Sequence, residues 1–268
     1  MTEHKRPEHK CSGIDENIPH REERAMQASK LYSVGAAEVH VWCASSNDFE
    51  GWDSLEAVMS PSEKETARRF RLTENRQAYE LAHGLLRHLL ARYLNCDPAK
   101  LEFSREEYGK PCLTTRDLAV NLSHSGDNVA IAIARSAVGV DIEKIKTKQV
   151  DADLISRCLT ASEQLWLHAE AEDSQRRFFR LWTLKEATLK ADGRGLGIGC
   201  HEAELSMSAY GDAATVVIEN ATWKACGLPA GREYCLAVAA REIRNIELRT
   251  VRHTDNLELA RTIKVKPQ

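Results

Sequence analysis

The sequence predicts an α+β fold composed of two halves of similar content. Segments in which apolar and polar residues alternate with period two recur along the chain and predict β-strands. Two long segments carry apolar residues at helical spacing and predict one amphipathic helix in each half. A long helix packed on a small sheet in each half is typical of the α+β class. We expect the halves at residues 37–136 and 137–248, flanked by a polar, disordered tail at 1–36 and a C-terminal tail at 249–268.

The composition is that of a soluble globular protein. Of the 268 residues, 43% are hydrophobic and 29% are charged, and the formal net charge is -3. This charge excludes a generally basic nucleic-acid binder, and no apolar stretch is long enough to span a membrane, so neither partner is expected. The eight cysteines are scattered without a C-x-x-C pair, which argues against a zinc site. Because the N-terminus lacks the apolar core of a signal peptide, we expect a cytoplasmic protein.

In the first half, a helix-start pattern and a long amphipathic segment lie between predicted strands. Ser60, Pro61 and Glu63 place a proline at the first helical position and a glutamate three residues after the cap. Residues 75–94 carry the apolar stripe of a long helix. Strands are predicted at residues 37–42, 101–103, 118–122 and 129–134. The segment 123–127 is predicted to be a loop.

The second half begins with a predicted strand at residues 137–143. Thr160 and Glu163 form a capping box at the start of a helix, and a longer helix is expected from near Ser174 to about Ala191. Alternation over residues 201–240 predicts three or four antiparallel strands. The last residues, 257–268, are expected to form a weakly held tail.

Two carboxylates on the strand at 137–143 provide the first chemical signal. Asp141 and Glu143 are two residues apart, so on a strand they point to one face while the apolar residues between them point to the other. Two carboxylates on one face repel each other unless a cation lies between them, and oxygen ligands favour Mg²⁺. On the later helix, Trp182, Glu186 and Lys190 form one row. A third carboxylate and a lysine can therefore converge on the metal, although each pattern alone is also typical of a solvated surface.

Four segments in this order resemble the Sfp-type 4′-phosphopantetheinyl transferases. The family pattern is G-K-P, then S-H-S, then G-(I/V)-D-(I/V)-E, then W-x-x-K-E-(A/S)-x-x-K. The matching segments are residues 108–111, 121–126, 138–143 and 182–190. The similarity covers about residues 37–240, and the last two motifs together are specific.

The resemblance implies a fold in which two similar α+β halves are related by a pseudo-twofold axis. It also implies that coenzyme A and Mg²⁺ bind between the halves. The implied reaction moves 4′-phosphopantetheine from coenzyme A to a serine of an apo acyl, aryl or peptidyl carrier protein, and releases adenosine 3′,5′-bisphosphate. Since both halves are present in one chain, we expect a monomer.

The resemblance also implies roles for individual residues. Asp141, Glu143 and Glu186 match the metal-binding acids, and Lys190 matches the lysine at the pyrophosphate. The resemblance also implies that Asp141 contributes to binding coenzyme A. Glu186 serves as metal ligand, as the base that takes the serine proton, or as both, and the sequence leaves these alternatives open.

A second group of residues matches the nucleotide end of coenzyme A. These residues are Lys110, Ser123 and His124. The arginine that meets the 3′-phosphate is harder to place, and Arg76 is the candidate, with His83 and Arg87 as alternatives. Trp182 is expected to pack in the core and fix the helix.

Two other functions are compatible with the same acids. A Mg²⁺-dependent phosphohydrolase would use them with a water nucleophile, but it leaves Lys110 and the S-H-S segment unexplained. A catalytically inactive module that binds carrier proteins or nucleotides would not need the complete set of Asp141, Glu143, Glu186 and Lys190. The sequence does not determine which carrier protein or pathway is served.

Overall fold

The structure is a computed structural model that describes residues 32–115, 117–169, 173–195, 199–207, 212–259 and 261–267. Its helices are α2 (Trp52–Val58), α3 (Pro61–Arg68), α4 (Thr73–Leu94), α5 (Ala152–Cys158), α6 (Ala161–His168) and α7 (Ser174–Asp192), with 3₁₀ turns η1 (Pro98–Lys100), η3 (Cys200–Glu202) and η4 (Thr254–Leu259). No helix in the described part of the chain is long and apolar enough to cross a membrane. None of the seven cysteines in this part forms a disulfide.

The strands form two five-stranded sheets and one hairpin. The first sheet has the order β12 (Arg261–Val265), β11 (Asn245–Thr250), β1 (Glu38–Ser45), β5 (Asn128–Ala134) and β4 (Ala119–Ser125). The second has the order β6 (Val138–Lys144), β10 (Tyr234–Ala240), β9 (Ala221–Leu228), β8 (Ala213–Ile218) and β7 (Glu204–Met207). Strands β2 (Phe103–Arg105) and β3 (Pro111–Leu113) form the hairpin.

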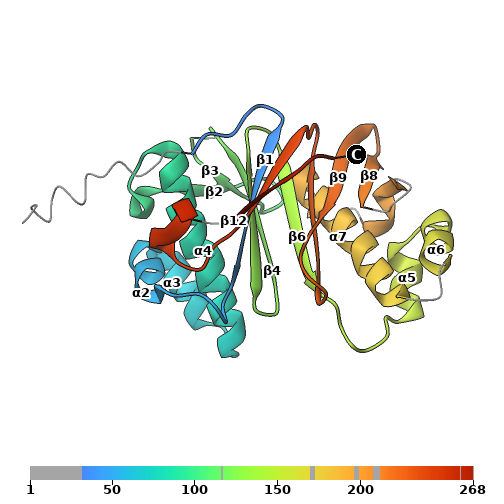
Figure 1. The fold of residues 1–268 in the computed structure, drawn as a ribbon, viewed down its shortest axis with the longest axis horizontal. Helices are drawn as coiled ribbons and strands as arrows, with labels where there is room; N and C mark the ends of the chain where they lie inside the picture. The colour runs from blue at the N-terminus through green and yellow to red at the C-terminus, as the bar shows by residue number, and fades with distance from the viewer. Residues whose placement is uncertain are drawn as a thin grey trace, which may run out of the picture. The chain divides into compact units, whose positions relative to one another are not determined.

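Three apolar clusters order these elements into layers. One cluster joins α4 to the first sheet, a second joins α7 to the second sheet, and a third lies between the sheets. The long helices accordingly lie on the outer faces, with the two sheets between them (Figure 1). The α+β class and the two predicted long helices are confirmed.

The two halves repeat the same sequence of elements. Each half has one strand, two short helices and one long helix before its remaining strands. The helix before each long helix begins with a capping box, at Ser60 and Glu63 in α3 and at Thr160 and Glu163 in α6. The capping glutamate then forms a salt bridge with a buried cation on the long helix. Arg87 is the cation in the first half and Lys185 in the second.

The C-terminal residues do not form the weakly held tail that we expected. Strand β11 pairs in parallel with β1, and β12 pairs with β11, so both belong to the first sheet. Within the expected tail, Val251 and Leu257 are buried in the core of the first half. The sequence alone could not assign this long-range parallel pairing, because an alternating pattern does not specify the partner of a strand.

At the other end, the expected tail at residues 1–36 lies largely outside the described residues. Tyr32 and Val34 are exceptions, because both pack against the core of the first half. The hydroxyl of Tyr32 also donates a hydrogen bond to the carbonyl of Leu257 at 2.9 Å. The ordered fold therefore begins before residue 37.

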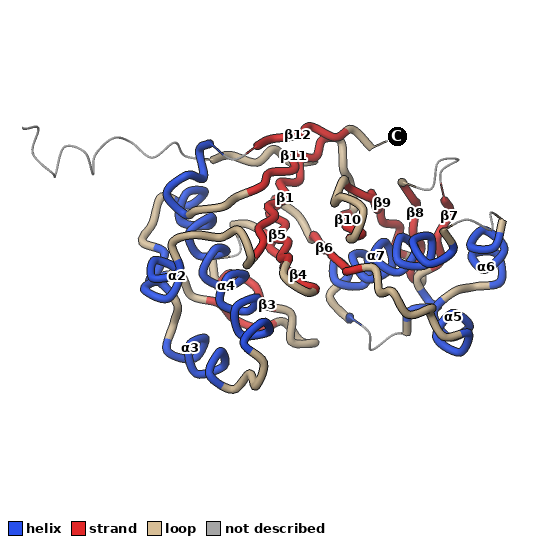
Figure 2. The backbone as a smooth tube through the Cα atoms, turned by 60° about the horizontal axis from the view of Figure 1, so that its bottom comes forward, coloured by secondary structure: helices blue, strands red, loops and turns tan. Residues whose placement is uncertain are grey.

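The predicted loop at 123–127 is the other correction. Ser123 and Ser125 lie within β4, which turns into β5 only at Gly126 and Asp127. Gly126 has a φ of 57°, a left-handed conformation that glycine adopts without strain. On a strand, Ser123 and Ser125 share one face and His124 points to the other. Strand β4 lies beside β6, at the place where the two sheets meet (Figure 2).

Candidate active site where the two halves meet

Strand β6 presents its two acids to helix α7, as the period-two pattern predicts. Val140 and Ile142 are buried in the core between the sheets. Asp141 and Glu143 point the opposite way, and both are contacted by side chains of α7. The side chain of Asp141 is only 4% exposed, so the site is shielded from water on this side.

Gly139 allows α7 to lie directly against β6. A Cβ atom at this position would be 2.0 Å from the carbonyl oxygen of Ala187 and 2.4 Å from the nitrogen of Ala191. Both are backbone atoms, which cannot move without shifting the helix. The glycine before the D-x-E motif therefore brings Glu186 and Lys190 within reach of the strand acids.

Asp141 is held by one lysine and one serine. The Nζ of Lys190 lies 2.6 Å from its Oδ1, and the hydroxyl of Ser123 donates to the same oxygen at 2.8 Å. The Nζ of Lys190 also donates to the Oγ of Ser123 at 2.9 Å. Burial raises the pKa of Asp141, and the nearby ammonium opposes that shift.

Glu143 is held by two different side chains. The hydroxyl of Ser125 donates to its Oε2 at 2.8 Å, and the indole Nε1 of Trp182 donates to its Oε1 at 3.2 Å. Trp182 packs against the core of the second half, as expected, but it also contacts an acid of the site. The row of Trp182, Glu186 and Lys190 predicted on α7 thus faces β6.

The buried oxygens of this site fit a hard cation. The Oδ2 of Asp141 and the Oε1 of Glu186 are buried without a hydrogen-bond partner among the described residues. Burial raises the pKa of Glu186 to about 7, with Asp141 and Glu143 adding to the shift and Lys190 opposing it. Because buried polar atoms almost always have partners, two bare carboxylate oxygens, on β6 and on the face of α7 that contacts it, favour a cation such as Mg²⁺.

A different group of acids is more tightly clustered. Among the described residues, ligand atoms of Glu38, His40 and Glu247 all lie within 4.8 Å of one another. However, the carboxylate of Glu247 is paired with Arg249 and with Lys264. The negative charge of this cluster is already compensated, so it has less need of a metal than the carboxylates beside α7.

The structure brings Lys110 to the scaffold of the site rather than to its acids. Its Nζ donates to the carbonyl of Val138 at 3.0 Å and to that of Ala191 at 3.5 Å. These carbonyls belong to the start of β6 and the end of α7. Burial lowers the pKa of the Lys110 ammonium. In this state the lysine links the two elements that carry the acids.

Of the three basic residues considered for the 3′-phosphate, only His83 acts on the pKa of His124. Burial lowers that pKa most, and the charges of Lys190 and His83 lower it further. Arg76 forms an ion pair with Glu80 and lines a separate cavity with residues of α2 and α3. Arg87 is buried and donates to Glu63 and to the carbonyls of Pro98 and Leu101, so its guanidinium is committed to the fold.

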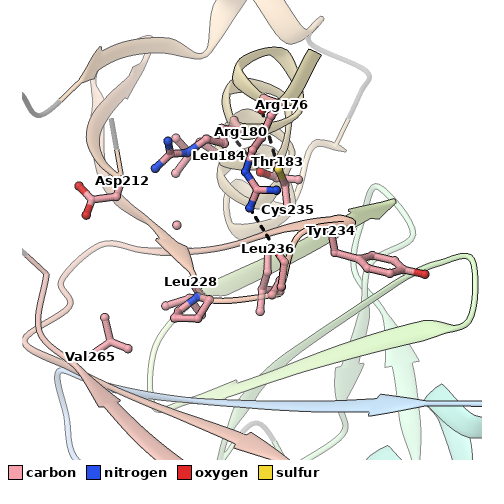
Figure 3. Close-up of a pocket in the computed structure, with 14 residues that line it drawn as sticks. Arg176, Arg180, Thr183, Leu184, Asp212, Leu228, Tyr234, Cys235, Leu236 and Val265 are labelled. Atoms are coloured by element: carbon pink, nitrogen blue, oxygen red, sulfur yellow. Dashed lines mark hydrogen bonds between the residues drawn. The ribbon is translucent and has the colours of Figure 1, made fainter. Parts of the chain in front are cut away.

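A cavity of about 460 Å³ lies beside His83. The rings of Tyr79 and His83 are stacked at 4.1 Å between centroids, and Leu122 of β4 also lines the cavity. A second cavity, of about 590 Å³, lies between the start of α7 and the β9–β10 turn (Figure 3). Arg176 and Arg180 line it, and none of its lining residues belongs to the predicted site.

Sequence reasoning missed three contacts of this site. Asn121, whose Oδ1 accepts a hydrogen bond from the amide of Val140, and Ser125 were assigned no role, and Trp182 was assigned only to packing. The period-two spacing of residues 121, 123 and 125 was visible, but the predicted loop concealed it. Extending the strand through residue 125 would have placed all three side chains on one face.

Comparison with known proteins identifies two matching family models. The model described as "4′-phosphopantetheinyl transferase superfamily" matches residues 137–239, and that described as "4′-phosphopantetheinyl transferase, N-terminal" matches residues 41–136. Together they cover both halves of the fold.

Curated proteins are similar over much of the chain. The chain is 35% identical to 4′-phosphopantetheinyl transferase Sfp of Bacillus subtilis (strain 168), over 53% of this chain and 63% of that protein. It is 31% identical to a 4′-phosphopantetheinyl transferase of Bacillus subtilis, over 68% of this chain and 77% of that protein. It is 34% identical to 4′-phosphopantetheinyl transferase HetI of Nostoc sp. (strain PCC 7120), over 59% and 70% respectively.

Proposed function

Because the chain belongs to the 4′-phosphopantetheinyl transferase superfamily, we propose that it transfers 4′-phosphopantetheine from coenzyme A to a serine of an apo carrier protein. One observation carries the proposal. Three acids and a lysine lie on the facing sides of β6 and α7. One carboxylate oxygen of Asp141 and one of Glu186 are buried without a hydrogen-bond partner among the described residues. This arrangement of negative and positive side chains supports the function that the sequence resemblance implies.

The chemistry is a displacement at phosphorus. The serine oxygen of the carrier forms a bond to the β-phosphorus of coenzyme A, while the bond from that phosphorus to the bridging oxygen breaks and adenosine 3′,5′-bisphosphate leaves. When bound, Mg²⁺ supplies the positive charge that the pyrophosphate requires in the transition state. Asp141, Glu143 and Glu186 are the residues that would hold it.

Glu186 and Lys190 act on the two ends of the reacting bonds. Glu186 takes the proton of the attacking serine in addition to contributing to the metal site. Lys190 lies one helical turn further on and stabilises the negative charge that develops on the bridging oxygen. The same ammonium orients Asp141 before the substrate binds.

The nucleotide end of coenzyme A fits the cavity beside His83. The stacked rings of Tyr79 and His83 offer a flat aromatic surface, and His83 and His124 offer donors for the 3′-phosphate. This assignment replaces Arg76 with His83 as the basic residue upstream of the S-H-S segment.

Since both halves of the site belong to one chain, we infer that the active form is a monomer. We also propose a cytoplasmic location, as expected from the sequence.

The decisive experiment uses apo carrier proteins. The protein is incubated with coenzyme A, Mg²⁺ and a panel of apo acyl, aryl and peptidyl carriers, and each carrier is weighed by mass spectrometry. We expect at least one carrier to gain the mass of one phosphopantetheine, and Asp141→Ala to lose at least about 100-fold in rate. Cleavage of coenzyme A at the same rate with and without carriers would instead indicate a phosphohydrolase. No mass gain on any carrier would contradict the transferase assignment.

A further inference from the structure

Strand β6 is the edge strand of its sheet on the side that faces β4. In the first half, the equivalent edge belongs to β1 and is covered by β11. In the described part of the second half, β6 pairs with β10 on one side only. An uncovered edge leaves backbone N–H groups without the partners that a neighbouring strand would supply.

Side chains of β4 supply those partners. The amide of Val140 donates to the Oδ1 of Asn121 at 2.9 Å. The amide of Ile142 donates to the Oγ of Ser123 at 3.4 Å, and the amide of Lys144 donates to the Oγ of Ser125 at 3.0 Å. Both sets of residues are spaced by two, so the period of one strand matches that of the other. Three polar side chains of β4 thus accept the hydrogen bonds that the backbone of a neighbouring strand would otherwise accept.

Ser123 and Ser125 also donate hydrogen bonds to the two acids of β6. Ser123 accepts from the amide of Ile142 and donates to Asp141. Ser125 accepts from the amide of Lys144 and donates to Glu143. Each hydroxyl therefore fixes the backbone after an acid and one oxygen of that acid at the same time.

We propose that Ser123 and Ser125 are positioning residues that set the geometry of the two metal-binding acids on β6, and that Asn121 anchors the same strand without touching an acid. The inference rests on the proposed function, because it assumes that Asp141 and Glu143 hold Mg²⁺. A hydroxyl has one proton to donate and two lone pairs. Ser123 uses all three, because Lys190 and the amide of Ile142 donate to it while its proton goes to Asp141. Its one proton is therefore directed at the acid, which is the contact that sets the geometry of Asp141.

Asn121 provides a matched control within the same structure. The residue before Val140 is Gly139, which has no side chain, so Asn121 has no acid to hold. Asn121→Ala removes a backbone anchor alone, whereas Ser125→Ala removes an anchor and a carboxylate partner. Ser125→Thr keeps the hydroxyl. Ser206→Ala, at an exposed position of β7, is the control for the substitution itself.

Two readouts that need no carrier protein test the proposal. Amide hydrogen exchange reports the anchors, and titration of the metal-free protein with Mg²⁺ by calorimetry reports the acids. Exchange should become faster at Lys144 in Ser125→Ala and at Val140 in Asn121→Ala. The Kd for Mg²⁺ should rise about 10–100-fold in Ser125→Ala, the usual effect of losing a partner of a metal ligand. It should stay at the wild-type value in Asn121→Ala, Ser125→Thr and Ser206→Ala.

Equal Kd values for Ser125→Ala and Asn121→Ala would overturn the positioning role, and unchanged exchange at both amides would overturn the anchoring role. A wild-type protein that transfers phosphopantetheine while Ser125→Ala binds Mg²⁺ normally would remove this inference and leave the proposed function intact. Conversely, the predicted Mg²⁺ and exchange changes without any carrier modification would support the positioning residues and contradict the proposed function.

Discussion

The Nζ of Lys190 lies 2.6 Å from the Oδ1 of Asp141, at the carboxylate where we propose that Mg²⁺ binds. The lysine side chain is 27% exposed, whereas that of Asp141 is 4% exposed, so the ammonium approaches from the open side of the site. In the metal-free protein this ammonium is the nearest compensating charge for a buried acid. Lys190 holds Oδ1 of this carboxylate while Oδ2 has no partner among the described residues, so metal binding and the Lys190 contact are coupled through one carboxylate.

We expect Lys190→Met to destabilise the metal-free protein by up to about 3 kcal/mol, because it leaves Asp141 buried without its cation. Mg²⁺ should then raise the melting temperature of the variant more than that of the wild type, since the metal replaces the lost charge. Thermal unfolding with and without Mg²⁺ measures both effects. The control is Lys100→Met, whose side chain is 82% exposed. Equal melting temperatures for the Lys190 variant and the wild type without metal would contradict the coupling.

We expect Mg²⁺ binding at pH 7 to release protons from Glu186. Burial raises the pKa of this carboxyl to about 7, so it is partly protonated in the metal-free protein, and a cation favours its charged form. Calorimetry in two buffers of different ionisation enthalpy measures the protons released. Glu186→Gln should remove most of this release. The same release from the variant and the wild type would assign the protons to another group.

The same raised pKa predicts how stability changes with pH. A carboxyl with a raised pKa in the folded state contributes stability that is fully present below the ordinary pKa of 4.5 and is lost as the pH rises through about 7. Metal-free wild type should therefore lose stability between these values relative to Glu186→Gln. Urea unfolding of both proteins at pH 4.5, 6 and 7.5 measures the difference. A constant difference across this range would show that Glu186 does not titrate there.

We expect Gly139→Ala to impair both folding and catalysis. The added Cβ would lie 2.0 Å from the carbonyl oxygen of Ala187, so α7 must move away from β6 and carry Glu186 and Lys190 with it. Overpacking of this kind costs about 1–3 kcal/mol or more. Urea unfolding and the carrier assay measure the two effects. Gly35→Ala is the matched control, because its nearest contact is a flexible carboxylate at 3.4 Å.

We expect Lys185→Met to destabilise the second half by about 3–5 kcal/mol, because it leaves the buried carboxylate of Glu163 unpaired. The two side chains are 2.7 Å apart and at most 1% exposed. The double variant Glu163→Gln, Lys185→Met should recover part of the loss, since no unpaired charge remains. Chemical unfolding of the two single variants and the double variant measures the coupling. Purely additive losses would argue against a specific buried pair.

We expect His83→Ala and His124→Ala to weaken coenzyme A more than dephospho-coenzyme A, because both side chains are assigned to the 3′-phosphate. Each lost charge-assisted hydrogen bond is worth about 1.5–3 kcal/mol. The ratio of KM values for the two substrates is the measurement, and Arg76→Ala, in a separate cavity, is the control. Equal losses for both substrates would move the histidines away from the 3′-phosphate.

Local patterns were sufficient to predict much of this protein. The capping boxes at Ser60 and Thr160, the long helices and the alternating acids of β6 depend on neighbours within four residues along the chain, so the sequence specifies them directly. The row of Glu186 and Lys190 follows from helical spacing alone. These elements, together with the four motifs, also carried the family resemblance.

Contacts between distant segments could not be predicted from local patterns. The place of β11 beside β1, the partners of Glu63 and Glu163, and the commitment of Lys110 to two carbonyls each join residues that local spacing cannot relate. The roles of Ser123 and Ser125 belong to the same class. The two serines are two residues apart, which the sequence shows. Their hydroxyls accept hydrogen bonds from β6 only because the edge of β6 has no neighbouring strand to accept them. Local spacing in the sequence predicted the three acids and the lysine of the site, and the packing of two sheets and two helices decided what each of them contacts.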